Sequence, residues 1–234
     1  MNTRRFLLLS RALFFMGVMI GFARSVIAIW DNLEATDYYF SGVTYAPFKG
    51  LRCPLVIAPT EKGVVTAVFN NPANEEDNFF YRAEISGKAF SKRRIEDQIL
   101  VPPHQAKFFR FTVDARDVDL LFFILVKITI LPNSIHPAQD ATCGMIVTNL
   151  LGLTGSQISL AALILSMTGV VTGLFLWEGK NSKLSGNRPR IVQFLGLVVL
   201  CALLATYMGW WIVATVLVVI IILLVIISMR FAFA

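Results

Sequence analysis

Long uncharged apolar runs dominate the C-terminal third of the chain. The first, Ile158–Trp177, has twenty residues without a charge, which is long enough to cross a hydrocarbon core of about 30 Å. Two further runs, Ile191–Met208 and Trp211–Met229, are separated only by Gly209 and Trp210. So short a joint predicts a tight helical hairpin that turns at the water interface.

The N-terminus has a basic end followed by an apolar stretch. Arg4, Arg5 and Arg11 precede the apolar run Ala12–Trp30, which is interrupted only by Arg24. This order fits a cleavable signal peptide or a signal anchor, and the length of the run favours the anchor. Arg24 lies near the end of the run, where its side chain could extend to the outer interface or act as an intramembrane charge.

Composition and charge support a membrane protein. Of the 234 residues, 56% are hydrophobic and only 15% are charged, which is too apolar for an ordinary soluble domain. The net charge is +6, but residues 1–30 and 158–234 hold nine Lys and Arg against one acidic residue, whereas residues 31–157 hold twelve against fourteen. The basic charge therefore belongs to the flanks of the apolar runs, which disfavours nucleic-acid binding.

The positions of the basic clusters predict an orientation. Lys and Arg concentrate on the cytoplasmic side of membrane proteins. The arginines before the first run, the cluster at Lys180–Arg190 and Arg230 all fall on one side if the chain crosses a plasma membrane four times with both termini inside. The predicted organisation is a signal-anchor helix at 1–30, an extracytoplasmic domain at 31–155, a second transmembrane helix at 156–178, a cytoplasmic basic loop at 179–190 and a helical hairpin at 191–234.

Between the first two spans, apolar and polar residues alternate with period two, as in Phe79–Ser86 and Phe109–Asp114. Such alternation is typical of strands that bury one face, and Pro- and Asn-rich turns separate the segments. About seven short strands in roughly a hundred residues predict an all-β, Ig-like sandwich attached to four transmembrane helices. The expected strands are Cys53–Ala58, Gly63–Asn70, Asn78–Ser86, Ile95–Val101, Lys107–Asp114, Leu120–Leu131 and Cys143–Leu150.

Two hairpins carry a resemblance. Leu55–Asn71 reads as a strand, a Pro-Thr-Glu turn, a second strand and an Asn, and Ile99–Val113 reads as two strands joined by a Pro-Pro turn. Together they resemble the Ig-like domains associated with alpha-galactosidases and with uncharacterised bacterial membrane proteins, over residues 55–131. The usual Gly after the second Pro is His104 here. The resemblance implies a bacterial non-catalytic spacer or interaction module, and it carries over no site residues.

The cysteines suggest one crosslink. Cys53 begins the first expected strand and Cys143 the last, and these strands can lie side by side in an Ig-like sandwich. An oxidising location outside the cell then favours a Cys53–Cys143 disulfide, which would stabilise the domain by about 4 kcal/mol, although two buried thiols are the alternative. Cys201 lies within the third span and is expected to be a small side chain facing a helix or lipid.

Candidate catalytic groups are sparse. The only histidines, His104 and His136, lie beside prolines and form no Cys/His cluster, so neither a zinc site nor a cofactor is expected. Asp31, Glu34 and Asp37 recur every third residue, and Glu75–Asp77 forms an acidic turn, but neither has the spacing of a calcium loop. The basic Lys92–Arg94 could meet a lipid headgroup or a sugar phosphate, or protect a strand edge.

Small residues form stripes on the first two predicted membrane helices. Gly17 and Gly21 make a Gly-x-x-x-Gly motif in the first helix. Such stripes allow close helix packing, either between these two helices or against a partner helix. No span has Asp, Glu, Lys or His in its interior, so ion-coupled transport has no evident path. The second stripe comprises Ser159, Ala162, Ser166, Gly169 and Gly173.

These observations favour a non-enzymatic, membrane-anchored accessory or scaffolding subunit. Its expected partners are the lipid bilayer, other membrane-protein subunits and a protein or glycan bound by the outer sandwich. Two alternatives are a component of a transport or export assembly and a membrane-bound enzyme with an interfacial site near Asp31–Asp37 or His136–Asp140.

Overall fold

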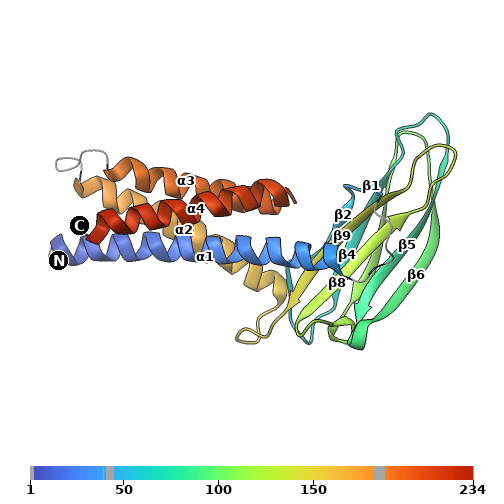
Figure 1. Cartoon of the computed structure of the whole chain (residues 1–234), viewed down its shortest axis with the longest axis horizontal. Helices are drawn as coiled ribbons and strands as arrows, with labels where there is room; N and C mark the ends of the chain where they lie inside the picture. Colours follow the sequence, from blue (N-terminus) through green and yellow to red (C-terminus); the bar gives the residue numbers. More distant parts are fainter. Residues whose placement is uncertain (1–2, 39, 41–44, 182–187, 234) are drawn as a thin grey trace. The chain divides into compact units, whose positions relative to one another are not determined.

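The computed structural model describes residues 3–38, 40, 45–181 and 188–233, and it divides the chain into two compact units. One unit contains Met1–Trp30 and Ser159–Ala234, and the other contains Asp31–Ile158. Figure 1 labels α1 to α4 and most of the strands. In chain order the elements are α1 Thr3–Asp37, β1 Ala46–Pro47, β2 Leu51–Arg52, β3 Val56–Ile57, β4 Gly63–Asn70, β5 Asp77–Gly87, η1 Lys88–Phe90, β6 Ser91–Val101, β7 Ala106–Val113, η2 Ala115–Asp117, β8 Phe123–Ile130, β9 Gln139–Val147, α2 Gly155–Asn181, α3 Arg188–Tyr207 and α4 Trp211–Phe233.

Three helices are long and apolar enough to cross a membrane within the described residues. Their candidate spans are Leu8–Asp37 in α1, Gly155–Trp177 in α2 and Arg190–Tyr207 in α3. The described apolar part of α4, Trp211–Ile227, is shorter than the length that a span usually needs. The sequence predicts four spans, and three helices meet the length and hydropathy expected of one.

The helix limits differ from the predicted ones. Helix α1 does not end at residue 30 but continues to Asp37, and α2 and α3 extend into the predicted basic loop. Residues 182–187 of that loop, including Lys183, lie outside the described residues. Gly209 joins α3 to α4 with φ at +73°, a left-handed conformation that ends a helix at low cost only for residues such as glycine.

The helical unit has its own apolar core. Residues from all four helices contribute side chains that are almost fully buried in it, because each helix presents apolar side chains to its neighbours. In Figure 1, α1, α2, α3 and α4 run alongside one another. Members of this core include Phe14, Val18, Val170, Leu195, Val199 and Ile221.

The β unit consists of two sheets. The larger has the strand order β1-β9-β8-β5-β6, with β3 also paired to β9, and the smaller has the order β2-β4-β7. Most ladders are antiparallel, but β1 and β3 both run parallel to β9. The unit also contains the α1 residues from Asp31 to Asp37. It is therefore a mixed-sheet, β-sandwich-like domain that also includes the end of α1.

The core of the β unit follows from the period-two pattern. In β4, Val65, Ala67 and Phe69 are fully buried, whereas most of the residues between them are partly exposed. Strand β8 is buried at every position from Phe123 to Ile130. Its second face is covered because Phe123 and Leu125 pack in one cluster with Ala35.

Several predicted strand limits are wrong, including the start at Ile95, because β6 begins at Ser91. The strand expected from Leu120 begins at Phe123, because Leu120 and Leu121 have positive φ values of 48° and 73° and form a turn. The last strand is Gln139–Val147 rather than Cys143–Leu150, so Cys143 lies inside it. Cys53 lies between β2 and β3 and begins neither strand.

The start of α2 is fixed by side chains. Thr154 and Gln157 form a capping box, in which each side chain accepts a hydrogen bond from the other's backbone N–H, at 3.3 and 3.0 Å. The Glu61 carboxylate accepts hydrogen bonds from the N–H groups of Ala58 and Gly155, at 3.0 and 2.7 Å. A negative charge at a helix N-terminus is favourable, so Glu61 joins the β3–β4 turn to the first turn of α2.

Candidate functional site

Strand β6 forms an edge of the larger sheet. It pairs with β5 over eleven positions, from Asp77 opposite Val101 to Gly87 opposite Ser91. Within the described residues, no strand pairs with its other side. Unpaired strand edges present backbone donors and acceptors that can bind another chain.

The N-terminal half of β6 is occupied by contacts within the domain. Arg93 donates to the Asp117 carboxylate at 2.7 Å and to the Thr112 carbonyl at 2.9 Å. Arg94 pairs with the buried Glu84 at 3.0 Å. One role that the sequence suggested for these arginines is to protect an exposed strand edge. In the structure they also hold β6 to its neighbours. The C-terminal half of the strand also has exposed side chains, at Glu96, Asp97, Gln98 and Leu100.

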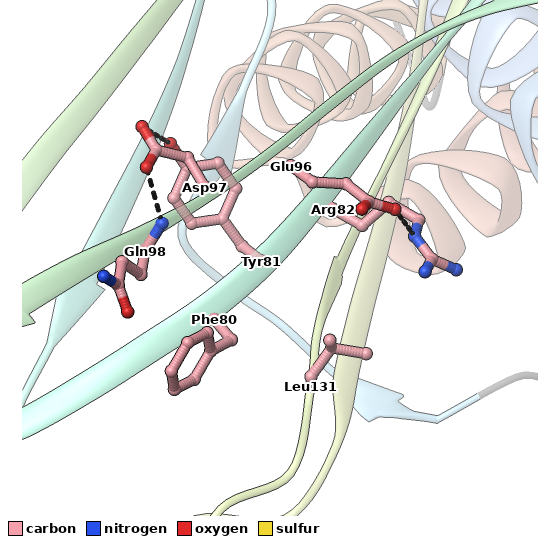
Figure 2. A pocket seen from close by; sticks show the side chains of 7 residues that line it. All are labelled: Phe80, Tyr81, Arg82, Glu96, Asp97, Gln98 and Leu131. Carbon is pink, nitrogen blue, oxygen red and sulfur yellow. Dashed lines mark hydrogen bonds and ion pairs between the residues drawn. The ribbon is translucent and has the colours of Figure 1, made fainter.

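A shallow pocket lies beside the C-terminal half of β6, with a volume of about 370 Å³. It is open to solvent, and Figure 2 shows side chains from β5 and β6 around it, with Leu131 on the far side. Leu131 is held there because its N–H donates to the Phe80 carbonyl at 2.8 Å. The lining residues are Phe80, Tyr81, Arg82, Glu96, Asp97, Gln98 and Leu131.

The pocket combines one aromatic surface with paired polar groups. The Phe80 side chain is 46% exposed. The Arg82 Nε atom lies 2.6 Å from Glu96 Oε1, and the Gln98 side-chain oxygen accepts from Asn78 at 3.1 Å. Such a mixture can bind a ligand by apolar contact and directed hydrogen bonds.

Asp97 links the pocket to the interior. Its carboxylate accepts from the Gln98 backbone N–H at 2.8 Å and from the Tyr81 hydroxyl at 3.5 Å. The pKa of Tyr81 lies above its ordinary value, chiefly because burial disfavours the phenolate and further because Asp97 is negatively charged. The phenol therefore stays neutral and acts as a hydrogen-bond donor rather than as a base.

The structure joins Cys53 to Cys143 by a disulfide, across a sequence separation of 90 residues. Cys143 is buried in the sandwich core, and Cys53 packs against that core. The bond therefore ties the segment between β2 and β3 to the middle of β9. Cys201 is a free and exposed cysteine.

The small residues of α1 and α2 meet at close range. The Ser166 hydroxyl donates to the Gly17 carbonyl at 2.8 Å, and a Cβ on Gly17 would lie 2.6 Å from the Val170 nitrogen. Gly21, Gly169 and Gly173 likewise have no room for a side chain, since a Cβ would approach Ser166, Gly17 and Phe14. Ser159 and Ala162 are only half-buried.

Arg24 lies in this helical unit as well. Its guanidinium donates to the Thr206 hydroxyl at 3.3 Å, so α1 and α3 share a polar contact.

The histidines serve local contacts. His136 stacks on Phe79 with ring centroids 4.6 Å apart, and its Nε2 lies 3.8 Å from the buried Asp77 carboxylate. His104 is exposed and bonds Asn74 at 2.9 Å. In the part of the chain that the structure describes, no three His, Cys, Asp or Glu side chains are grouped so as to hold a metal ion.

The acidic residues that the sequence singled out are not brought together. Asp31 is buried and accepts from the Asn32 side chain at 3.1 Å, whereas Asp37, Glu75 and Glu76 are exposed.

Two polar contacts of the β unit have no signal in the sequence. Lys127 and Asp140 form a nearly buried ion pair at 3.1 Å, and the Tyr38 hydroxyl donates to Asp119 at 2.6 Å. Burial and Asp119 raise the pKa of Tyr38 above its ordinary value. The pairing of Lys127 with Asp140 depends on strand register, which the alternation of apolar residues does not specify.

Comparison with known proteins gives no family. No protein-family model matches the chain. No curated protein matches it either.

Solved structures match only at low TM-scores, and the matches include β-sandwich domains. A cycloisomaltooligosaccharide glucanotransferase of Paenibacillus sp. is 12% identical with a TM-score of 0.34, covering 45% of this chain and 14% of that one. A CARDB domain from Pyrococcus furiosus is 10% identical with a TM-score of 0.31, covering 42% and 87%. A superoxide reductase (neelaredoxin) of Ignicoccus hospitalis is 13% identical with a TM-score of 0.33, covering 45% and 82%.

Proposed function

We propose that the chain is a membrane-anchored accessory subunit whose sandwich binds an extended segment of a protein partner along the C-terminal half of β6. The observation that carries the proposal is the unpaired side of β6 beside a pocket in which Phe80 is half-exposed. In strand addition, backbone hydrogen bonds supply affinity, and a pocket receives one side chain of the added strand.

The state of the edge supports this mode of binding. The Gln98 backbone N–H donates to the Asp97 carboxylate rather than to another strand. An incoming strand would exchange this side-chain hydrogen bond for a backbone one. An apolar side chain of the partner would cover Phe80 and Leu131 in the pocket, and burying the exposed ring area contributes roughly 25 cal/mol per Å².

We further propose the full topology predicted by the basic clusters, with four spans, both termini in the cytoplasm and an Ig-like sandwich outside. The three candidate spans support the membrane location, and the run of apolar residues in α4 supports a fourth crossing, whose short length local thinning of the bilayer can accommodate. Attachment to the membrane before and after the sandwich suits a fixed assembly.

The test is to extract the full-length protein from its own membrane in mild detergent and to identify the chains that co-purify with it. Phe80→Glu places a charge in the pocket, and Val64→Glu is the matched control, because Val64 is 49% exposed on β4 in the other sheet. We expect a stable complex that Phe80→Glu dissociates and Val64→Glu preserves.

Two results would overturn the proposal. One is a native mass that corresponds to the chain alone or to copies of itself. The other is a complex that survives Phe80→Glu unchanged. Retention of a glycan by the partner-free protein, lost in Phe80→Glu, would instead assign the pocket to carbohydrate.

A further inference from the structure

Two apolar loops lie together at one end of the β unit. The first, Leu120–Phe122, connects η2 to β8, and the second, Thr148–Leu153, connects β9 to α2. They are neighbours because Phe123 pairs with Ile146 and the Val147 N–H donates to the Phe122 carbonyl at 2.8 Å.

The tips of both loops expose leucine side chains almost completely. Leu121 is 93% exposed and Leu151 is 91% exposed, and Leu150 and Phe122 beside them are partly exposed. Both tip residues have positive φ, at 73° and 54°. Non-glycine residues rarely adopt this conformation, and Asn or Asp tolerates it better than leucine. The backbone conformation therefore favours Asn or Asp at positions 121 and 151, but both positions hold leucine.

The loops are also free of charge. Neither Leu120–Phe122 nor Thr148–Leu153 contains an Asp, Glu, Lys or Arg. Asp119 directly precedes the first loop in sequence, and its carboxylate accepts a hydrogen bond from the Tyr38 hydroxyl at 2.6 Å. An uncharged apolar tip can enter the headgroup region of a bilayer without burying an ion.

The few residues between Leu151 and α2 limit how far this loop can lie from the start of the candidate span. Leu151 lies four residues before Gly155, where the candidate span of α2 begins. Four residues extend at most about 14 Å, at 3.3–3.6 Å each. The capping box at Thr154 and the Glu61 hydrogen bond to Gly155 lie within the β unit and hold the first turn of α2 there. If α2 crosses a bilayer, the Leu151 loop and its neighbour lie at the lipid surface.

We propose that Leu121, Phe122, Leu150 and Leu151 insert into the interfacial region of the membrane and anchor this end of the sandwich to lipid. The inference requires that α2 spans the bilayer, but it does not depend on the partner proposed for β6.

The test places an environment-sensitive fluorophore on a single cysteine. In full-length protein with Cys201→Ala and the native disulfide intact, Leu151→Cys and Leu121→Cys are each labelled with a nitrobenzoxadiazole probe. The protein is reconstituted into vesicles of phosphatidylcholine and phosphatidylglycerol. Phe108→Cys is the matched control, because Phe108 is 62% exposed on β7 and lies near the opposite end of the sandwich.

We expect blue-shifted emission at residues 121 and 151, with quenching by a phosphatidylcholine that carries a nitroxide high on its acyl chain several-fold greater than at residue 108. Because both leucines are exposed, neither substitution removes a packed contact, and both variants should fold. Water-like emission with quenching equal to that at residue 108 would overturn the proposal. Blue-shifted emission without nitroxide quenching would also overturn it, because the loops would then be covered by protein.

Discussion

Loss of the Cys53–Cys143 disulfide should lower the stability of the folded sandwich strongly. The bond closes a loop of 90 residues. In the chain-entropy model, breaking a bond that closes a loop of this length raises the entropy of the unfolded chain. The free energy of unfolding then falls by about 4 to 5 kcal/mol. The free energy of unfolding of the sandwich in the variant Cys53→Ala/Cys143→Ala should fall by that amount.

Pulse proteolysis across a urea series measures this change on the full-length protein in mild detergent, because only the unfolded sandwich is cut rapidly. The urea midpoint should fall, and the slope of free energy against urea should rise as the unfolded chain expands. Cys201→Ala is the control and should leave the midpoint unchanged, since Cys201 is a free cysteine outside the β unit.

Reduced wild-type protein separates crosslinking from packing. It lacks the bond but keeps both sulfur atoms, so its difference from the double alanine variant reports the small cavity at the buried Cys143. A fall of less than about 1 kcal/mol in both proteins would refute the entropic reasoning.

Three further predictions concern charge, packing and pH. Asp140→Asn should lower the free energy of unfolding by about 3 kcal/mol in the same assay, because it leaves Lys127 as a nearly buried cation, and the added change Lys127→Met should restore most of the loss. Gly17→Leu should destabilise the helical unit by about 1 to 3 kcal/mol in a titration with SDS followed by circular dichroism, whereas Met19→Leu on the exposed side of α1 should be neutral. The pKa of Tyr81 is higher in the folded than in the unfolded protein. The neutral phenol should therefore stabilise the folded sandwich fully below the unfolded pKa of about 10, and this stabilisation should be lost as the pH rises through the folded pKa. Tyr81→Phe should remove a late step from the ultraviolet titration of tyrosine.

Period-two alternation predicted the long strands well where one face is buried and the other is wet. The expected Gly63–Asn70 matches β4 residue for residue, and Asn78–Ser86 lies within β5. The short strands β1 and β2 have two residues each, too few for any alternation to show. The apolar run from Leu120 predicted a longer β8, because hydrophobicity alone does not reveal the left-handed turn at Leu121.

The candidate site was hidden because it depends on which strands are neighbours. Phe80 and Arg82 stand out as exposed positions of an alternating strand, but their apposition to Gln98 and Glu96 follows from the β5–β6 register. The hydrogen bond from Gly155 to Glu61 joins residues 94 apart in sequence. The small-residue stripe was visible, because close approach of helices requires residues without bulk.

The parallel pairing of β1 and β3 with β9 also sets when the sandwich can be completed during synthesis. Residues at the beginning of the domain stay without their partner strand until Gln139–Val147 has been made, and non-local pairing of this kind is slow to form. A nascent chain that stops before Gln139 therefore exposes Val56 and Ile57, together with an unpaired thiol at Cys53. Such a fragment is a substrate for proteases and a source of mispaired disulfides, so interrupted translation should leave no stable partial domain.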